Sequence, residues 1–112
     1  MNYLAIPGLK FRPRSIPARG FINSDRIINI VLNHFDLSFA QISRKTRYQN
    51  IVYPRHVLIY ILSKNTNLTL KGIGEMFHKD HTTVMHSIKV IEERMATEDC
   101  IKFEIMELED SI

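Results

Sequence analysis

Residues 68–87 have the sequence LTLKGIGEMFHKDHTTVMHS, and this pattern predicts two helices joined by a short turn. Thr69 can cap a helix over residues 70–77, because its hydroxyl can accept a hydrogen bond from an N–H of the first helical turn. Asp80 can cap a longer helix from residue 81 to about residue 98 in the same way. A short helix, a turn of about three residues and a long helix form a helix-turn-helix. The apolar residues that repeat at helical spacing and should be buried are Leu70, Ile73, Phe77, Val84, Ile88, Ile91 and Met95.

Two glycines lie inside the first of these helices. Gly72 and Gly74 should each weaken a helix by about 1 kcal/mol relative to alanine. Their presence therefore indicates that another part of the chain comes too close for a side chain. We expect this to be close packing against a neighbouring helix.

Upstream, the pattern predicts one helix and one isolated helical turn. Ser24 is the expected cap of a helix over residues 24–35, and Ser38 is the expected cap of a single turn that ends near residue 43. The residues expected to face the core are Ile27, Ile28, Val31, Leu32, Phe35, Leu37, Phe39 and Ile42.

The middle and the end of the chain add a loop and two more helices. Residues 44–50 are basic and polar without periodicity, which predicts an exposed loop. A helix should then run to about residue 65 with Pro54 in its first turn, where a missing N–H loses no helical partner. An amphipathic segment over about residues 100–109 completes an all-α bundle of about six helices. The buried residues expected here are Val57, Leu58, Ile61, Leu62, Ile101, Ile105 and either Leu108 or Met106.

Length and charge indicate one globular domain with a polyanionic partner. The chain has 112 residues, of which 45% are hydrophobic, and a net charge of +3. Residues 92–112 have eight acidic and two basic residues, whereas residues 1–91 have thirteen basic and four acidic residues. A basic surface upstream should therefore bind phosphate while the acidic end packs elsewhere. We expect a basic arm over residues 1–22, which either binds phosphate or is simply hydrated, and a globular domain over residues 23–112.

The location of the protein is predicted from what the sequence lacks. Cys100 is the only cysteine, so that no disulfide can form within the chain, and a reducing compartment is expected. The first residues do not form a secretory signal, and no apolar run reaches the 18 or more residues that a membrane span needs. The expectation is a protein of the bacterial cytoplasm or nucleoid.

The helix that begins at His81 has the side chains required to contact bases in a DNA major groove. Short polar residues in its first turn let the backbone approach the base edges and can hydrogen-bond or offer a methyl group to them. Further along, His86 and Lys89 continue the polar flank, and the helix dipole favours a phosphate nearby. The same residues would also make an ordinary, well-capped helix start. The expected base contacts are Asp80, His81, Thr82, Thr83 and His86.

Three segments resemble the C-terminal DNA-binding domain of the bacterial replication initiator DnaA, a helix-turn-helix domain of the Trp-repressor type. They are VYPRHV at residues 52–57, LTLKGIGEMF at residues 68–77 and KDHTTVMHS at residues 79–87. The likeness covers about residues 24–95, and the third segment is the most distinctive. In that family a major-groove helix and a basic loop in the adjacent minor groove recognise a short repeat in double-stranded DNA. The resemblance implies sequence-specific DNA binding in the control of replication initiation, with transcription regulation as the alternative.

The resemblance also implies contacts to the DNA backbone or to a groove. Lys79 stands where the family has a DNA-contacting arginine, Lys45 and Arg47 match the basic loop, and residues 67–69 match a helix start near phosphate. Arg55 is either a further phosphate contact or an internal partner. The full expected set is Arg44, Lys45, Arg47, Gln49, Arg55, Asn67, Leu68, Thr69, Lys71, Lys79 and Lys89.

The chain departs from the family pattern at three points. Residues 77–79 replace the family's Phe-Gly-Gly-Arg with one residue fewer, which alters the turn. Gln49 replaces the second arginine of the basic loop, and since arginine suits a narrow minor groove, the target sequence should differ. No Gly-x-x-x-x-Gly-Lys-Ser/Thr phosphate loop occurs. We expect a free-standing relative without the ATPase module, of the kind that a phage, a mobile element or an accessory regulator would supply.

Two other classes of function were weighed against DNA binding. His81 and His86 are five residues apart, about 500° around the helix axis, so they do not share the face that a metal site on one helix needs. We expect no metal, no cofactor and no catalytic residue. A protein-interaction module that acts on a resident replication initiator is the remaining alternative, through the basic and acidic segments. The family type implies a monomer on one asymmetric repeat.

Overall fold

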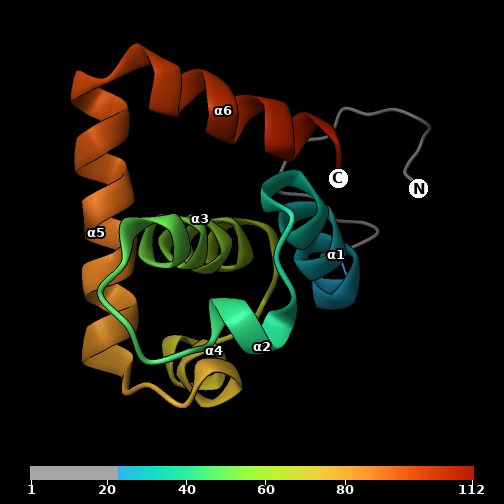
Figure 1. Cartoon of the computed structure of the whole chain (residues 1–112), viewed down its shortest axis with the longest axis vertical. Coiled ribbons are helices and arrows are strands. Elements are labelled where there is room, and N and C mark those ends of the chain that lie inside the picture. The colour runs from blue at the N-terminus through green and yellow to red at the C-terminus, as the bar shows by residue number, and fades with distance from the viewer. Residues whose placement is uncertain (1–22) are drawn as a thin grey trace.

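The computed structural model describes residues 23–112, and these residues form six α-helices and no strand (Figure 1). The helices are α1 (Ser24–Phe35), α2 (Phe39–Ile42), α3 (Gln49–Asn65), α4 (Leu70–Phe77), α5 (His81–Thr97) and α6 (Asp99–Asp110). The prediction of an all-α bundle of about six helices is confirmed. The expected basic arm lies outside the described residues. Within residues 23–112 no helix is both long enough and apolar enough to span a membrane.

The centre of the fold is α3, and each of the other five helices packs against it. All four residues predicted to be buried in this helix are fully buried, and Ile59 is buried as well. Its apolar residues therefore occupy more than half of the helix circumference, as expected of a helix inside a bundle. In Figure 1, α6 crosses over α3 from the end of α5 towards α1, whereas α2 and α4 lie on the opposite side of α3. The molecule thus has two ends, one at α6 and one at α2 and α4.

Capping residues explain where most helices begin. The predicted caps are confirmed at Ser38, Thr69 and Asp80, whose side chains accept backbone N–H groups of Gln41, Gly72 and Thr83. The predicted cap of α1 is wrong by one residue. Asn23 rather than Ser24 caps it, because the Asn23 side chain accepts the N–H of Asp25 at 2.7 Å.

The predicted start of α3 is also wrong. The helix begins at Gln49, so Pro54 is its sixth residue and lies beyond the first turn. The carbonyl of Tyr48 accepts N–H groups at 3.0 and 2.8 Å, and these bonds start the helix before the proline is reached. Pro54 has no N–H for the carbonyl four residues earlier, that of Asn50. Because Asn50 is exposed, water can bind this carbonyl instead. The exposed loop is therefore shorter than predicted.

The apolar faces of the remaining helices agree with prediction in most positions. Several of the predicted core residues are only partly buried and pack at the margin of the core: Ile28, Leu32, Phe35, Leu37, Phe39, Leu70, Ile88 and Met95. On α6, Leu108 is 2% exposed and Met106 is 46% exposed, so Leu108 is the buried one of the two candidates. Met106 instead faces solvent beside Phe103, which is 63% exposed.

Candidate nucleic-acid interface

The turn between α4 and α5 is held by backbone hydrogen bonds. The N–H of Lys79 donates to the carbonyl of Gly74 at 2.8 Å, and the N–H of His78 donates to the carbonyl of Glu75 at 3.3 Å. His78 has a φ of 57°, the left-handed conformation in which helices commonly end. The turn therefore fixes the direction in which α5 leaves α4.

Gly74 is required by this turn. A Cβ atom at this position would lie 2.5 Å from the carbonyl oxygen of Lys79, which is too close for any side chain. The close approach predicted from the glycines is confirmed, but it is made by the backbone of the turn and not by a neighbouring helix. At Gly72 a Cβ atom would lie 3.2 Å from the hydroxyl of the Thr69 cap. The first turn of α4 itself therefore limits the space for a side chain at this position. The turn is so short that its backbone folds back onto the last turn of α4.

The first turn of α5 is exposed to solvent. Its cap, Asp80, accepts the N–H of Thr83 at 2.8 Å, and this hydrogen bond holds the pKa of the Asp80 carboxyl below its usual range. His81 and Thr83 are exposed on either side of Thr82. Four exposed residues lie within about 100° of one another around the helix axis and form what we name the reading face. They are Thr82, Met85, His86 and Lys89.

His86 lies at the edge of the reading face that borders α3. Its ring is edge-on to that of His56, with 6.2 Å between the ring centroids. The pKa of His56 is lowered to about 4. Burial is the main cause, and Arg55, the neighbouring His86 and Arg94 contribute to the same shift. His56 is therefore neutral near pH 7 beside a positively charged surface.

The basic loop before α3, residues 43–48, carries three exposed cations: Arg44, Lys45 and Arg47. Arg55 of α3 anchors this loop, because its Nη1 donates to the carbonyls of Ile42 at 3.3 Å and Arg44 at 2.7 Å. Arg55 is 8% exposed, and burial lowers the pKa of its guanidinium. Of the two alternatives for this residue, the structure therefore has the internal partner, and the expected phosphate contact is withdrawn.

The basic loop and the turn come together in space. Burial lowers the pKa of Lys79, and the nearby charges of Arg55 and Lys45 lower it further. Phe39 of α2 and Phe77 of α4 also pack with their ring centroids 5.4 Å apart, which holds α2, and the loop that follows it, beside α4. Cations separated by more than thirty residues in sequence thus form one positively charged end.

The start of α4 contributes a further part of this end. Asn67, Thr69 and Lys71 are exposed, while Leu68 is partly buried and packs against the core. The N–H of Leu68 donates to the Thr66 hydroxyl at 3.2 Å, so this expected phosphate donor already has a partner. Gln49 is exposed in the first turn of α3, directly after the basic loop.

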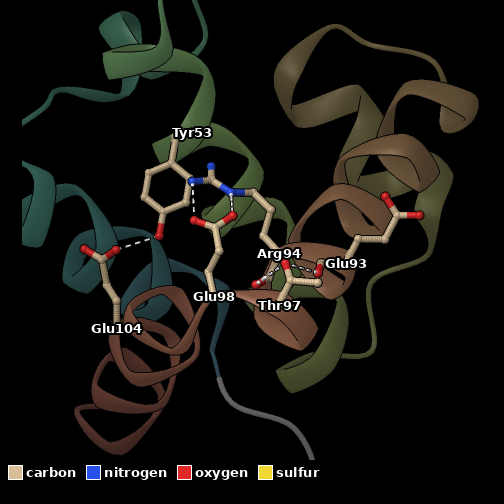
Figure 2. Close-up of polar contacts among 6 residues, drawn as sticks. All are labelled: Tyr53, Glu93, Arg94, Thr97, Glu98 and Glu104. Carbon is tan, nitrogen blue, oxygen red and sulfur yellow. Dashed lines mark hydrogen bonds and ion pairs between the residues drawn. The ribbon is translucent and has the colours of Figure 1, made fainter.

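The opposite end of the protein is held by paired charges. Figure 2 shows the hydroxyl of Tyr53 pointing at Glu104, to which it donates at 2.6 Å. Burial and this carboxylate raise the pKa of Tyr53. Arg94 lies over the Tyr53 ring at 4.9 Å and pairs with Glu98 at 3.1 Å. These contacts, with a 2.8 Å bond between His34 and Glu104, join α1, α3, α5 and α6.

Two exposed residues of the positively charged end were missed by the sequence reasoning. Met85 is 51% exposed on the reading face, and its position three residues after Thr82 was the signal that could have found it. Tyr48 is 75% exposed at the end of the basic loop. The sequence reasoning placed Tyr48 in an exposed loop but assigned no contact to it.

Comparison with known proteins places this arrangement in a family. The family model described as bacterial dnaA protein helix-turn-helix matches residues 24–91, which is more than half of the chain. The chain belongs to the bacterial DnaA helix-turn-helix family. Among its relatives is the chromosomal replication initiator protein DnaA of Lactobacillus acidophilus, 36% identical over 88 residues, which are 78% of this chain and 19% of that protein. The DnaA protein of Lacticaseibacillus casei is 34% identical over 105 residues, 93% of this chain and 22% of that protein.

The family match covers α1 to α4 and most of α5. This chain spans about a fifth of the length of the DnaA proteins that it matches. All of the residues assigned above to the turn, the reading face and the basic loop lie within the DnaA family match, whereas α6 lies after its last residue, Ile91. The family match therefore includes the whole of the positively charged end.

Proposed function

We propose that this protein binds double-stranded DNA in a sequence-specific manner. The first turn of α5 enters the major groove, and the basic loop contacts the adjacent groove. The observation that carries the proposal is that the reading face and the basic loop both lie against the N-terminal half of α3, the reading face through His86 beside His56 and the loop through the hydrogen bonds of Arg55. An exposed helix start with small side chains can approach base edges, and cations on both sides can neutralise the phosphates that flank a groove.

The proposed contacts follow from position and chemistry. Thr82 and His81 can hydrogen-bond to base edges, and Thr83, Asp80 and His86 lie beside them. Met85 adds an apolar surface suited to the methyl group of thymine. The remaining contacts, to phosphate or groove, are proposed for Arg44, Lys45, Arg47, Gln49, Asn67, Thr69, Lys71, Lys79 and Lys89.

The names of the relatives suggest the process that this binding serves. They are chromosomal replication initiator proteins. We therefore propose control of DNA replication initiation as the role of the bound site. Transcription regulation would use the same groove contacts and differ in the location of the target.

The test is selection of binding sites from a random duplex pool, with the unmodified chain and with Thr82→Ala. We expect an enriched motif, and a loss of about 1–3 kcal/mol at this motif in Thr82→Ala with little change on random duplex, as for a lost base contact. Thr97→Ala is the matched control, because it removes an exposed threonine from the other end of α5. It should retain the motif.

Two outcomes would contradict the proposal. Equal losses on the selected and the random duplex would remove Thr82 from base readout. A pool without enrichment would leave the protein-interaction alternative, for which the exposed Phe103 and Met106 on the acidic α6 would be the first surface to mutate.

A further inference from the structure

Tyr48 is an aromatic side chain without a structural role. It is the most exposed of the large apolar side chains in residues 23–112, at 75%, and its ring makes no aromatic or cation contact within that part of the chain. It occupies the cap position of α3 but makes no side-chain capping hydrogen bond. Tyr53 and Tyr60 of the same helix, by contrast, pack against the core. An exposed phenol ring that makes no such contact with residues 23–112 is available to bind a ligand.

The backbone that carries this ring is held firmly. The N–H of Tyr48 donates to the Thr46 hydroxyl at 3.2 Å, and its carbonyl accepts the first hydrogen bonds of α3. The bonds from Arg55 fix the start of the same loop. The ring is therefore presented at a defined place, and because tyrosine has only two side-chain torsions, ordering it on a ligand costs little entropy.

The residues around the Tyr48 ring indicate which class of ligand it can bind. Arg44, Lys45 and Arg47 precede it in the basic loop, and Gln49 follows it. Lys79 lies close enough to Lys45 for the two charges to influence each other. An aromatic ring among cations suits a ligand that has apolar flat groups between phosphates, which is the chemistry of a nucleic acid.

We propose that Tyr48 packs against the deoxyribose and base surface of the groove that the basic loop enters, and so contributes an apolar contact to duplex binding. The inference rests on the proposed function. It assigns to Tyr48 a role different from that of its neighbours, since Lys45 and Arg47 act on phosphate charge whereas the phenol ring carries none. The contribution of Tyr48 should therefore be insensitive to salt.

The chain contains no tryptophan, which permits a direct test with the full chain. Tyr48→Trp introduces a single fluorescent reporter in the loop, and Phe103→Trp introduces one at another exposed place, on α6 at the other end of the molecule. The probe is a random-sequence duplex at low salt, followed by the duplex from the selection. We expect duplex binding to protect the reporter of Tyr48→Trp from collisional quenching by acrylamide and to leave that of Phe103→Trp accessible.

Affinity measurements at several salt concentrations distinguish the apolar contact of Tyr48 from the charge contacts of the basic loop. Tyr48→Ser should weaken duplex binding by about tenfold with an unchanged salt slope, and Tyr48→Phe should bind nearly as well as the unmodified chain, because the ring is retained. Arg47→Gln should instead lower the slope. Because Tyr48 is exposed, these variants should fold, and a retained helical circular dichroism spectrum checks this.

The outcomes distinguish this inference from the proposed function. A reporter at position 48 that stays accessible in a saturated complex, with Thr82→Ala still impaired at its motif, would overturn the role of Tyr48 and leave DNA binding intact. Protection of both reporters alike would overturn it as well, since the effect would not be local. An unmodified chain that binds no duplex would overturn both.

Discussion

The two ends of α5 satisfy their charges in opposite ways. At its C-terminal end, Arg94 pairs with Glu98, and Glu104 accepts hydrogen bonds from side chains on two other helices. At its N-terminal end, the cations of the basic loop and Lys79 form no ion pair within residues 23–112, and Arg55 uses neutral carbonyls. Charges are paired at one end, whereas the cations at the other end have no ion-pair partner within residues 23–112.

This difference has an energetic consequence. Like charges held close together repel one another, so the positively charged end stores unfavourable energy that a phosphate backbone would relieve. At the acidic end, the carboxylates of Glu98, Glu104 and Glu109 already accept hydrogen bonds. Variants that remove a hydrogen bond at the acidic end should therefore lower stability without changing duplex binding. Variants that remove a cation of the basic loop should change duplex binding.

The largest expected effect is on the turn at the positively charged end. Gly74→Ala should lower the free energy of unfolding by about 2–3 kcal/mol, because its methyl group would overlap the Lys79 carbonyl, and should abolish selective duplex binding. Chemical denaturation and duplex titration measure both. The control is Gly72→Ala, which meets only the Thr69 hydroxyl and gains helix propensity, so its stability should change little. Equal stability of the two variants would mean that the turn can shift.

The next effect should be confined to the acidic end. Tyr53→Phe removes the hydrogen bond to Glu104 and should cost about 1.5–3 kcal/mol of stability, the range for a hydrogen bond to a charged group. Duplex affinity should not change. Tyr60→Phe on the same helix removes a hydroxyl that makes no hydrogen bond within residues 23–112, so it should be nearly neutral. Loss of DNA binding in Tyr53→Phe would show that the two ends are coupled.

A smaller effect should appear as a pH dependence of stability. The folded state holds His56 neutral down to a pKa of about 4, whereas in the unfolded chain it takes up a proton near pH 6.5. Stability is thus unaffected above pH 6.5 and falls as the pH drops towards 4. The loss should be about 1–2 kcal/mol, less than the full shift because the ring is partly solvated. His56→Gln should lack this component. Denaturation curves that fall in parallel for both proteins would contradict the assignment.

The smallest effect is on salt dependence alone. Lys45→Gln and Arg47→Gln should each lower the slope of log affinity against log salt by about one, because each cation neutralises one phosphate. Lys102→Gln removes an exposed cation from α6 and should leave the slope unchanged. If Lys102→Gln lowered the slope as well, the division of the molecule into a binding and a structural end would be wrong.

Much of the fold could be predicted because it depends on local chemistry. The helix-turn-helix followed from apolar spacing and from two caps, Thr69 and Asp80, that act within three residues of themselves. The errors arose at two helix starts, where a neighbouring residue or hydrogen bond began the helix before the expected residue did. Asn23 precedes Ser24 and caps equally well, and the hydrogen bonds to the Tyr48 carbonyl start α3 before Pro54 can. The proline rule describes where a proline is preferred, not where a helix must begin.

The sequence by itself determined the helices, the turn and the division into a basic and an acidic part, because spacing, capping and charge are properties of neighbouring residues. Only the tertiary structure decided that Lys45 approaches Lys79, that Arg55 is an internal anchor and that the Tyr48 ring makes no aromatic or cation contact within residues 23–112. These relations join or separate residues that are distant in the chain. They are set by how α2, α3 and α4 pack around a shared core, and packing of this kind has no signature in a local pattern.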